Sequence, residues 1–147
     1  MSASAEVLSQ AFTLGYTYTR STGPVVGRFL TALRDRKIVG IKGSDGKVIV
    51  PPMEWDPVTA EALSDFVDLP DTGVVKSWAW VKHPRGKHPL DKPFAWAQIQ
   101  FDGADIPMIH CVDAGDESAM KTGMRVKVRW AEETIGSIND IACFDPA

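Results

Sequence analysis

The stretch 93-PFAWAQIQFDGADIPMIHCV-112 contains two apolar runs joined by Asp-Gly-Ala-Asp. Both runs, 93–101 and 105–112, are rich in aromatic and β-branched residues, which favour strands. Asp-Gly in the link 102–105 is a common turn sequence between antiparallel strands. The stretch therefore predicts a β-hairpin, and it decides the fold class of the C-terminal half.

Further strands are predicted on both sides of this hairpin, at 73–82, 124–130 and 138–144. Apolar and basic residues alternate in 124-MRVKVRW-130, which is typical of a strand with one buried face. Residues 113–123 have room for one short helical turn between the third and fourth strands. Five short strands with such a crossover predict a small OB-type β-barrel over residues 71–147.

The N-terminal part has a different pattern. Large apolar and small polar residues alternate in 12-FTLGYTYT-19, which predicts a half-buried strand. Apolar residues recur at helical spacing in 24–36, and Pro24 suits a first helical turn. This N-terminal strand or arm and its helix form a first region, residues 1–36.

A small ribbon module is predicted over residues 37–70. The runs 37–43 and 47–52 flank Ser-Asp-Gly. They predict a β-hairpin whose second strand ends at Pro-Pro. Residues 56–67 predict a short helix, with Asp56 as the N-cap and Pro57 at its first position. The fold class is therefore mostly β: an N-terminal helix, a ribbon hairpin and a five-stranded barrel.

The amino-acid composition narrows the functions that this chain could have. The chain has 147 residues and a formal net charge of −3, which disfavours a role centred on nucleic acid. Its two cysteines, Cys111 and Cys143, lie in apolar runs and are expected to be free buried thiols. The first twenty residues lack the features of a secretory signal, and no apolar run approaches the roughly 18 residues of a membrane span. A cytoplasmic protein is expected.

Phosphate-loop and metal motifs were compared with the glycine-rich hairpin. Gly40 and Gly46 lie too far apart for a P-loop, and a strand follows where the P-loop needs a helix. Pair spacing of the zinc type occurs at Gly40 with Gly43 and at Asp56 with Thr59. Glycine offers no side-chain ligand, so no metal is predicted there.

The three histidines give two further hypotheses. His83 and His88 lie in a Pro-rich loop, where only Asp91 could support them as metal ligands. His110 and Asp113 are candidate catalytic residues beside Cys111. Because neighbouring residues on a strand point to opposite faces, His110 and Cys111 are not expected to meet.

Positive charge gathers between residues 76 and 92, where five basic residues stand against one acidic residue. Trp78 and Trp80 share one face of the strand that carries Lys76 and Lys82. Aromatic planes beside cations suit a ligand with a flat base and phosphates, such as coenzyme A (CoA) or a single-stranded nucleic acid. Core packing of the tryptophans is the alternative. The candidate binding residues are Trp78, Trp80, Lys82, His83, Arg85, Lys87, His88 and Lys92.

The order of elements resembles a prokaryotic family, the acyl-CoA-associated OB-fold proteins with an N-terminal rubredoxin-like zinc ribbon. The resemblance rests on 51-PP-52, on 93-PFAWAQIQFDGAD-105 and on 123-GMRVKVRW-130, and it covers roughly residues 23–144. The family's ribbon carries Cys-x-x-Cys before the Pro-Pro and Cys-Pro-x-Cys after it. The resemblance puts Gly40, Gly43, Asp56 and Thr59 at these ligand positions, so a ribbon without zinc is expected.

Members of this family accompany thiolase-like enzymes, and this chain is most similar to the partners of steroid side-chain aldolases. The resemblance implies a non-catalytic but required subunit of a hetero-oligomeric lyase, with an acyl-CoA thioester as the substrate ligand and no covalently bound cofactor. A thiolase or acyltransferase partner is one alternative. The others are an OB-fold module that binds single-stranded nucleic acid through Trp78 and Trp80, and an enzyme centred on His110 and Asp113.

Overall fold

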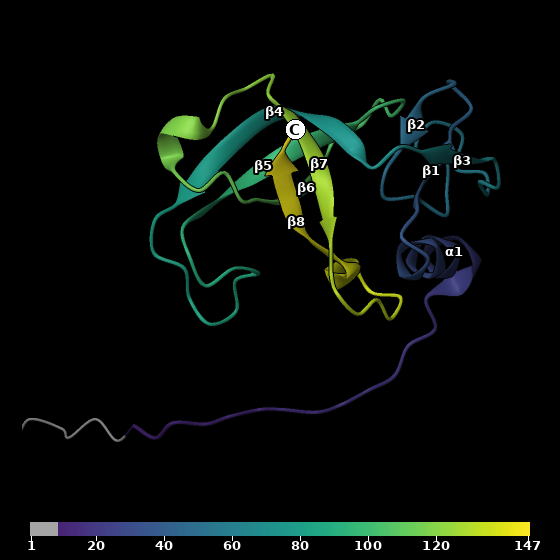
Figure 1. Ribbon diagram of the computed structural model, residues 1–147. Coiled ribbons are helices and arrows are strands. Elements are labelled where there is room, and N and C mark those ends of the chain that lie inside the picture. The colour runs from purple at the N-terminus through teal and green to yellow at the C-terminus, as the bar shows by residue number, and fades with distance from the viewer. Residues whose placement is uncertain (1–8) are drawn as a thin grey trace, which may run out of the picture.

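The computed structural model describes residues 9–147 (Figure 1). Helix α1 leads into a small three-stranded sheet, and the remaining strands form a barrel. In chain order the elements are α1 (Gly23–Arg34), β1 (Ile38–Lys42), β2 (Val48–Ile49), β3 (Phe66–Leu69), β4 (Thr72–Val81), β5 (Phe94–Phe101), β6 (Met108–Val112), the 3-10 turn η1 (Glu117–Ala119), β7 (Arg125–Trp130), the 3-10 turn η2 (Ile138–Asp140) and β8 (Ile141–Pro146). The predicted mostly-β class, with one helix, a ribbon hairpin and a five-stranded barrel, is confirmed.

The barrel closes in the strand order β4-β5-β6-β8-β7, because β7 returns to pair with β4. All pairs are antiparallel except β6 with β8, which meet in parallel at Val112 and Phe144. The expected helical turn before β7 is η1. Two strands begin three residues later than predicted. The backbone N–H of Asp105 bonds to the ribbon residue Val48 instead of to β5, and a capped turn, η2, occupies 138–140.

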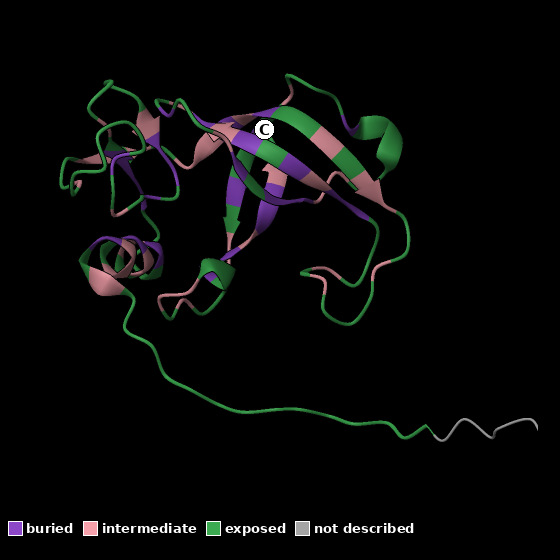
Figure 2. Ribbon diagram, turned by 180° about the vertical axis from the view of Figure 1, so that it is seen from behind, coloured by how far each residue is buried: buried purple, intermediate pink, exposed green. Residues whose placement is uncertain are grey.

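The barrel has a continuous apolar interior. Phe101 and Phe144 lie with their ring centroids 5.6 Å apart at its centre, and both are almost fully buried. Buried and exposed residues alternate along β7, as the sequence pattern predicts. Figure 2 shows the same alternation as stripes along the barrel strands. The burial of one face of each strand is what fixes the register of the barrel.

Helix α1 joins the two parts of the molecule. Its buried residues Val25, Phe29 and Leu33 are spaced four apart and therefore lie on one face. Val25 packs in the small core of the ribbon, whereas Phe29 and Leu33 pack in the barrel core. The helix predicted for 24–36 is confirmed, with bounds two residues earlier at the C-terminal end.

The ribbon sheet has the order β2-β1-β3, and its β1–β2 hairpin is the predicted one. The helix predicted for 56–67 is wrong. Residues 56–59 form an isolated turn that Ala60 ends with a φ of 59°, and β3 follows. The backbone N–H of Asp56 bonds to Glu61 O and that of Leu63 to Glu54 O. These bonds cross the loop, so the groups that a helix would pair along its axis are already used.

The N-terminal arm, residues 9–22, has no strand and no helix, so the strand predicted for 12–19 is wrong for the isolated chain. The arm runs away from the body of the molecule (Figure 1) and is exposed along its described length (Figure 2). A strand needs a neighbouring strand for its backbone groups, and none lies beside the arm.

None of the helices between residues 9 and 147 has the length and apolar character that crossing a bilayer requires.

Candidate functional site

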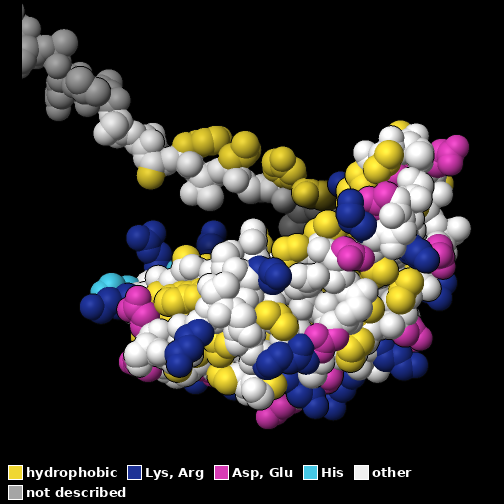
Figure 3. Space-filling model, turned by 90° about the horizontal axis from the view of Figure 1, so that it is seen from above, with side chains coloured by type: hydrophobic (Ala, Val, Ile, Leu, Met, Phe, Trp, Pro, Cys, Tyr) yellow, Lys and Arg dark blue, Asp and Glu magenta, His cyan; other side chains and the backbone are white. Residues whose placement is uncertain are grey.

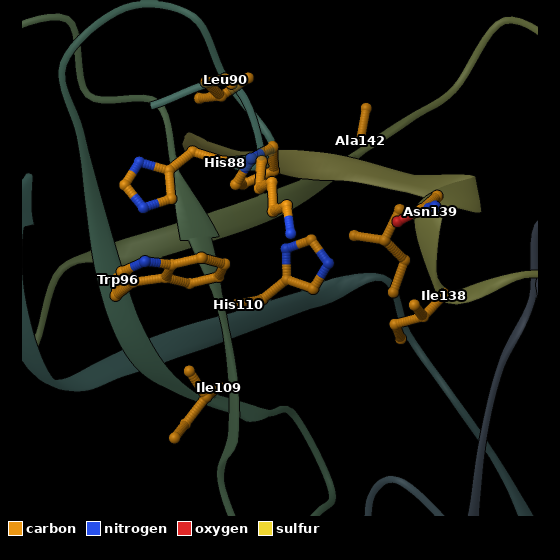
Figure 4. A pocket seen from close by; sticks show the side chains of 12 residues that line it. His88, Leu90, Trp96, Ile109, His110, Ile138, Asn139 and Ala142 are labelled. Carbon is orange, nitrogen blue, oxygen red and sulfur yellow. The ribbon is translucent and has the colours of Figure 1, made fainter. Parts of the chain in front are cut away.

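A pocket of about 670 Å³ opens between the loop that follows β4 and the strands β6 and β8. Figure 4 shows His88 and Trp96 on one side of the pocket, Ile138 and Asn139 on the other, and His110 between them. His88 and His110 lie 22 positions apart in the sequence, and sequence reasoning assigned them to different hypotheses. The fold brings them to one cavity.

The loop wall of the pocket is held by its own polar contacts. The backbone N–H of Arg85 donates to His88 Nδ1 at 3.0 Å, and the backbone N–H of His88 donates to Arg85 O at 2.8 Å. The His88 ring also meets Phe94 edge-on, with centroids 5.6 Å apart. His88 therefore has a structural role in shaping the loop. Beneath the loop lies a small apolar cluster of Phe94, Cys111 and Cys143.

His110 forms the floor of the pocket and is 8% exposed. Burial lowers the pKa of its imidazole, although backbone groups of Cys111 and Ile138 act in the opposite direction. The ring is therefore neutral near pH 7. Its edge faces the core residue Phe144 at a centroid distance of 5.6 Å.

His110 and Cys111 do meet, contrary to the sequence expectation. Cys111 Sγ lies 3.5 Å from His110 Nδ1, since the ring atom nearest the backbone remains within reach of the neighbouring side chain. The contact does not make a nucleophile. Burial raises the pKa of the Cys111 thiol to about 12, and the thiol donates to Ala142 O at 3.4 Å. Cys111 and Cys143 are buried free thiols, as expected.

Asp113 belongs to a different cluster. Its carboxylate accepts from Lys92 Nζ at 2.8 Å and from Arg129 Nη2 at 2.5 Å. Burial alone would raise the pKa of Asp113, but these two cations outweigh it and lower the pKa. Among residues 9–147 no hydrogen bond joins Asp113 to His110. The structure does not bring these two candidate catalytic residues together as an acid–base pair.

Oxygen and sulfur atoms of Asp113, Cys143 and Asp145 lie within 4.8 Å of one another, an arrangement that could surround a cation. The guanidinium of Arg129 already fills it. Arg129 Nη2 lies 2.5 Å from Asp113, 2.6 Å from Cys143 Sγ and 2.9 Å from Asp145. This arginine supplies the positive charge that the two carboxylates need.

The remaining predicted binding residues are divided between two sides of the loop. Trp78 and Trp80 are half-buried and pack against the barrel core, as the core-packing alternative requires. Trp80 and Lys82 border a second hollow of about 560 Å³ with residues 115–118. Lys87 lines the His110 pocket, and Arg85 lies beside this pocket. His83 is exposed, whereas Lys92 is paired with Asp113.

Asp56 caps the turn that follows it, as its predicted N-cap role implies, but sequence reasoning missed its bond to the first ribbon turn. Its carboxylate accepts three backbone N–H bonds, from Ser44 at 2.6 Å, from Val58 at 2.7 Å and from Thr59 at 3.0 Å. The bonds from Ser44 and Thr59 are the main reasons that the pKa of Asp56 falls to about 2. A charged carboxylate thus ties together the two turns of the ribbon. The Asp-Pro pair indicated the cap, and no local sequence signal indicated the bond to Ser44.

Of the four proposed ligand positions, Gly43, Asp56 and Thr59 lie together and Gly40 does not. A Cβ at Gly43 would lie 3.4 Å from Asp56 Oδ2, whereas a Cβ at Gly40 would lie 2.8 Å from Val48 Cγ1. The described ribbon offers zinc no cysteine or histidine, so its donor set does not fit that metal.

The two ribbon turns share one backbone feature. Each ends at a residue with positive φ, Gly46 at 81° and Ala60 at 59°. Aligning the turns on these residues matches Asp56 with Lys42 and Thr59 with Asp45. By this alignment Lys42 and Asp45, and not Gly40 and Gly43, are the counterparts of Asp56 and Thr59.

A family model matches most of the barrel. Residues 66–131 match the model described as the C-terminal OB-fold domain of ChsH2. The expected family resemblance is confirmed. The match covers β3 to β7 and stops before β8.

Two solved structures have the same fold. One is the aldolase described as Ltp2-ChsH2(DUF35), with a TM-score of 0.62, 18% identity, and coverage of 90% of this chain and 98% of that chain. The other is a DUF35-family protein of unknown function from Sulfolobus solfataricus, with a TM-score of 0.59, 22% identity, and coverage of 72% and 76%. No curated protein matches the chain in sequence. At these identities the structures support the fold alone.

Proposed function

We propose that this chain is the accessory subunit of a thiolase-like acyl-CoA aldolase, which cleaves the side chain of a steroid or related CoA thioester by a retro-aldol reaction. The observation that carries the proposal is the match of residues 66–131 to the OB-fold domain of ChsH2. The fold shared with nearly the whole chain of the Ltp2-ChsH2 aldolase structure supports it.

The chemistry of the described side chains supports catalysis by the partner. Retro-aldol cleavage needs a base for the β-hydroxyl proton and an oxyanion site for the thioester enolate. His110 is neutral, but it is only 8% exposed, and the carboxylate of Asp113 is paired with two cations. Burial holds Cys111 as a thiol. A supporting, non-catalytic subunit is the role that fits these groups.

The loop beside the pocket can contribute to binding CoA. Within the part of the chain that the structure describes, Lys82, Arg85 and Lys87 form no ion pair and remain available for the phosphates of CoA. Lys92 is already paired with Asp113. Exposed Ile109 and Ile138 border the same pocket and offer an apolar rim to the partner.

Co-expression with a thiolase-like protein from the same genome tests the proposal. We expect the two chains to co-elute in size-exclusion chromatography, and aldolase turnover of an acyl-CoA substrate to require both. Separate elution, together with equal turnover by the partner alone, would overturn it.

A charge reversal tests whether the loop contributes to binding the CoA thioester. The double variant Arg85→Glu/Lys87→Glu is expected to raise KM for the CoA thioester at least about tenfold, since charge-assisted bonds to phosphate are lost. Lys121→Glu, which reverses a charge outside both pockets, is the matched control and should leave KM unchanged. Equal KM values for the two variants would contradict a role of the loop in CoA binding.

A further inference from the structure

The N-terminal arm carries four large apolar side chains that are exposed to solvent, and Tyr16 and Tyr18 among them lie with their ring centroids 6.1 Å apart. Phe12 is 84% exposed, Leu14 is 75%, and Tyr16 and Tyr18 are each 77%. Figure 3 shows the apolar side chains gathered along the arm, which stands away from the body. Such a row in water is unfavourable, and a contiguous apolar surface of this kind marks an interaction site.

The spacing of these residues specifies a strand. They occupy every second position, so an extended backbone places all four on one face and Thr13, Gly15, Thr17 and Thr19 on the other. Threonine, tyrosine and phenylalanine also favour strands. From Ser9 to Thr19 the arm has no charged residue and no proline. The missing charge disfavours a phosphate backbone or an anionic lipid surface as the binding partner.

The open sheet edges of this chain are shorter than such a strand. In the closed order each barrel strand has two neighbours, but β4 pairs with β7 only at Thr72–Val74, so its residues 76–81 keep a free edge that is two residues shorter than the segment 12–19. The outer strands of the ribbon sheet are β2, with two residues, and β3, with four. If the predicted strand 12–19 paired with β2 or β3, half or more of its backbone would stay unpaired. This holds for the ribbon sheet of the same chain and for that of a second copy. Two arms paired with each other would form only a two-stranded ribbon, which is marginal in water.

We infer that residues 12–19 add as an edge strand to a β-sheet of the thiolase-like partner subunit, with Phe12, Leu14, Tyr16 and Tyr18 seated in an apolar groove beside that edge. This inference rests on the proposed function. Main-chain hydrogen bonds supply the affinity of strand addition, and the alternate side chains supply its specificity. The sequence pattern of the arm is then that of a strand whose sheet lies in another protein.

The attachment of the arm suits this role. Only Arg20, Ser21 and Thr22 separate the strand from α1, whose buried face is fixed in both cores of the molecule. A short tether of this kind gives the arm a high effective concentration once the body has docked.

Two arm variants of the full chain test the inference by their affinity for the partner. Phe12→Ser/Leu14→Ser/Tyr16→Ser/Tyr18→Ser removes the apolar face, and Thr13→Ser/Thr17→Ser/Thr19→Ser alters the opposite face while keeping its polarity. We expect Kd to rise at least about 30-fold in the first, which is what truncating one buried anchor costs, and to stay within about threefold in the second. Both variants lie outside the two cores, so circular dichroism should show an unchanged fold.

Residue-resolved amide exchange of the complex provides the signature of a strand. A strand paired on one side directs the N–H of every second residue to its neighbour, so alternate amides between 12 and 19 should become protected on adding the partner. Uniform exposure of these amides would overturn the inference, as would arm-dependent dimers of this chain that form without the partner.

The outcomes separate the inference from the proposed function. If the full chain binds the partner and the apolar-face variant binds equally well, only the role of the arm is wrong. If the full chain does not bind the partner, both are wrong.

Discussion

The barrel and the ribbon stabilise their β-structure by different means. The barrel closes around an apolar interior with Phe101 and Phe144 at its centre. The small core of the ribbon has three buried residues, Val25 from α1 and Ile41 and Ile49 from the sheet, with Leu63 and Phe66 packed against them. Its two turns are joined by the carboxylate of Asp56, which accepts three backbone N–H bonds. A small module with too little apolar area needs a cross-link, and here a carboxylate provides one.

The ribbon also uses the neighbouring barrel. The backbone N–H of Val48 donates to Asp105 Oδ2 at 2.8 Å, and the N–H of Asp105 donates to Val48 O at 2.9 Å. A small ribbon without a metal cross-link needs support from a neighbouring surface. Part of that surface lies within the chain, in the β5–β6 turn.

The largest loss of stability is expected in the barrel. Phe144→Ala removes one ring of the central pair and leaves a cavity in a closed, fully buried interior, at a cost of about 3–5 kcal/mol in the free energy of unfolding. Urea denaturation measures the change. Ile135→Ala, at a side chain that is 79% exposed, is the control and should change stability by less than about 0.5 kcal/mol. Similar losses in the two variants would mean that the barrel core is not what stabilises this half.

A metal-binding ribbon should be obtained by placing cysteines at the positions that the two turns share. We expect Lys42→Cys/Asp45→Cys/Asp56→Cys/Thr59→Cys to bind one zinc ion per chain, with a gain of about 4 kcal/mol in stability when zinc is a thousandfold above its Kd. Zinc content and Tm with and without zinc are the measurements.

The matched control for this design keeps the second pair and moves the first. Gly40→Cys/Gly43→Cys/Asp56→Cys/Thr59→Cys should bind zinc poorly, because a side chain at Gly40 points at Val48. Stronger zinc binding by this second variant would show that Gly40 and Gly43 are the first ligand pair after all.

The pH dependence of the ribbon turns should follow Asp56. Its pKa is about 2 in the folded chain and 3.8 ordinarily, so its contribution is present above pH 4 and disappears as the pH falls towards 2. Over that range we expect the amides of Ser44, Val58 and Thr59 to exchange at least about tenfold faster relative to barrel amides.

Two substitutions distinguish this effect from a general loss of structure. Asp56→Asn should show the faster exchange already at pH 7 and lose the pH dependence. Asp45→Asn changes a carboxylate of the neighbouring turn that bonds only to Lys47, and it should leave the exchange of Val58 and Thr59 unchanged. Identical exchange in all three proteins would show that Asp56 does not join the turns.

The smallest effect is expected at a surface ion pair beside the seam, which is the β4–β7 pairing that closes the barrel. Arg125 and Asp102 meet on the surface beside Thr72, with side chains 47% and 35% exposed, so solvent screens their attraction. Asp102→Asn should lower Tm by at most about 3 °C in a thermal denaturation experiment. A much larger decrease would show that the seam, and not the core, limits the stability of the barrel.

The sequence predicted the barrel well because its strands carry a local signal. Alternation in 124–130 and the Asp-Gly turn at 102–103 are read over a few residues, and both correspond to observed elements. The segments 12–19 and 56–67 were mispredicted for opposite reasons. The first has a strand pattern with no partner strand in the chain, and the second has helix-capping residues in a turn closed by cross-loop bonds.

The site was harder to predict because its contacts are long-range. No spacing rule relates His88 to His110. The two residues line the same pocket because the loop folds over β6. The pairing of Asp113 with Arg129 depends on the register between β7 and β8 and on a side chain from β6. Composition indicated a basic loop, but it did not show that Lys92 is already neutralised.

Helix α1 has a consequence for how this chain unfolds. Its one buried face supplies Val25 to one core and Phe29 and Leu33 to the other. Melting the helix would therefore open both cores, so sheet and barrel should denature in a single cooperative transition while only the two turns open locally. A ribbon coupled in this way to a larger folding unit is stabilised without a metal ion of its own. Such coupling gives a physical reason why this sequence tolerates a ribbon without cysteines.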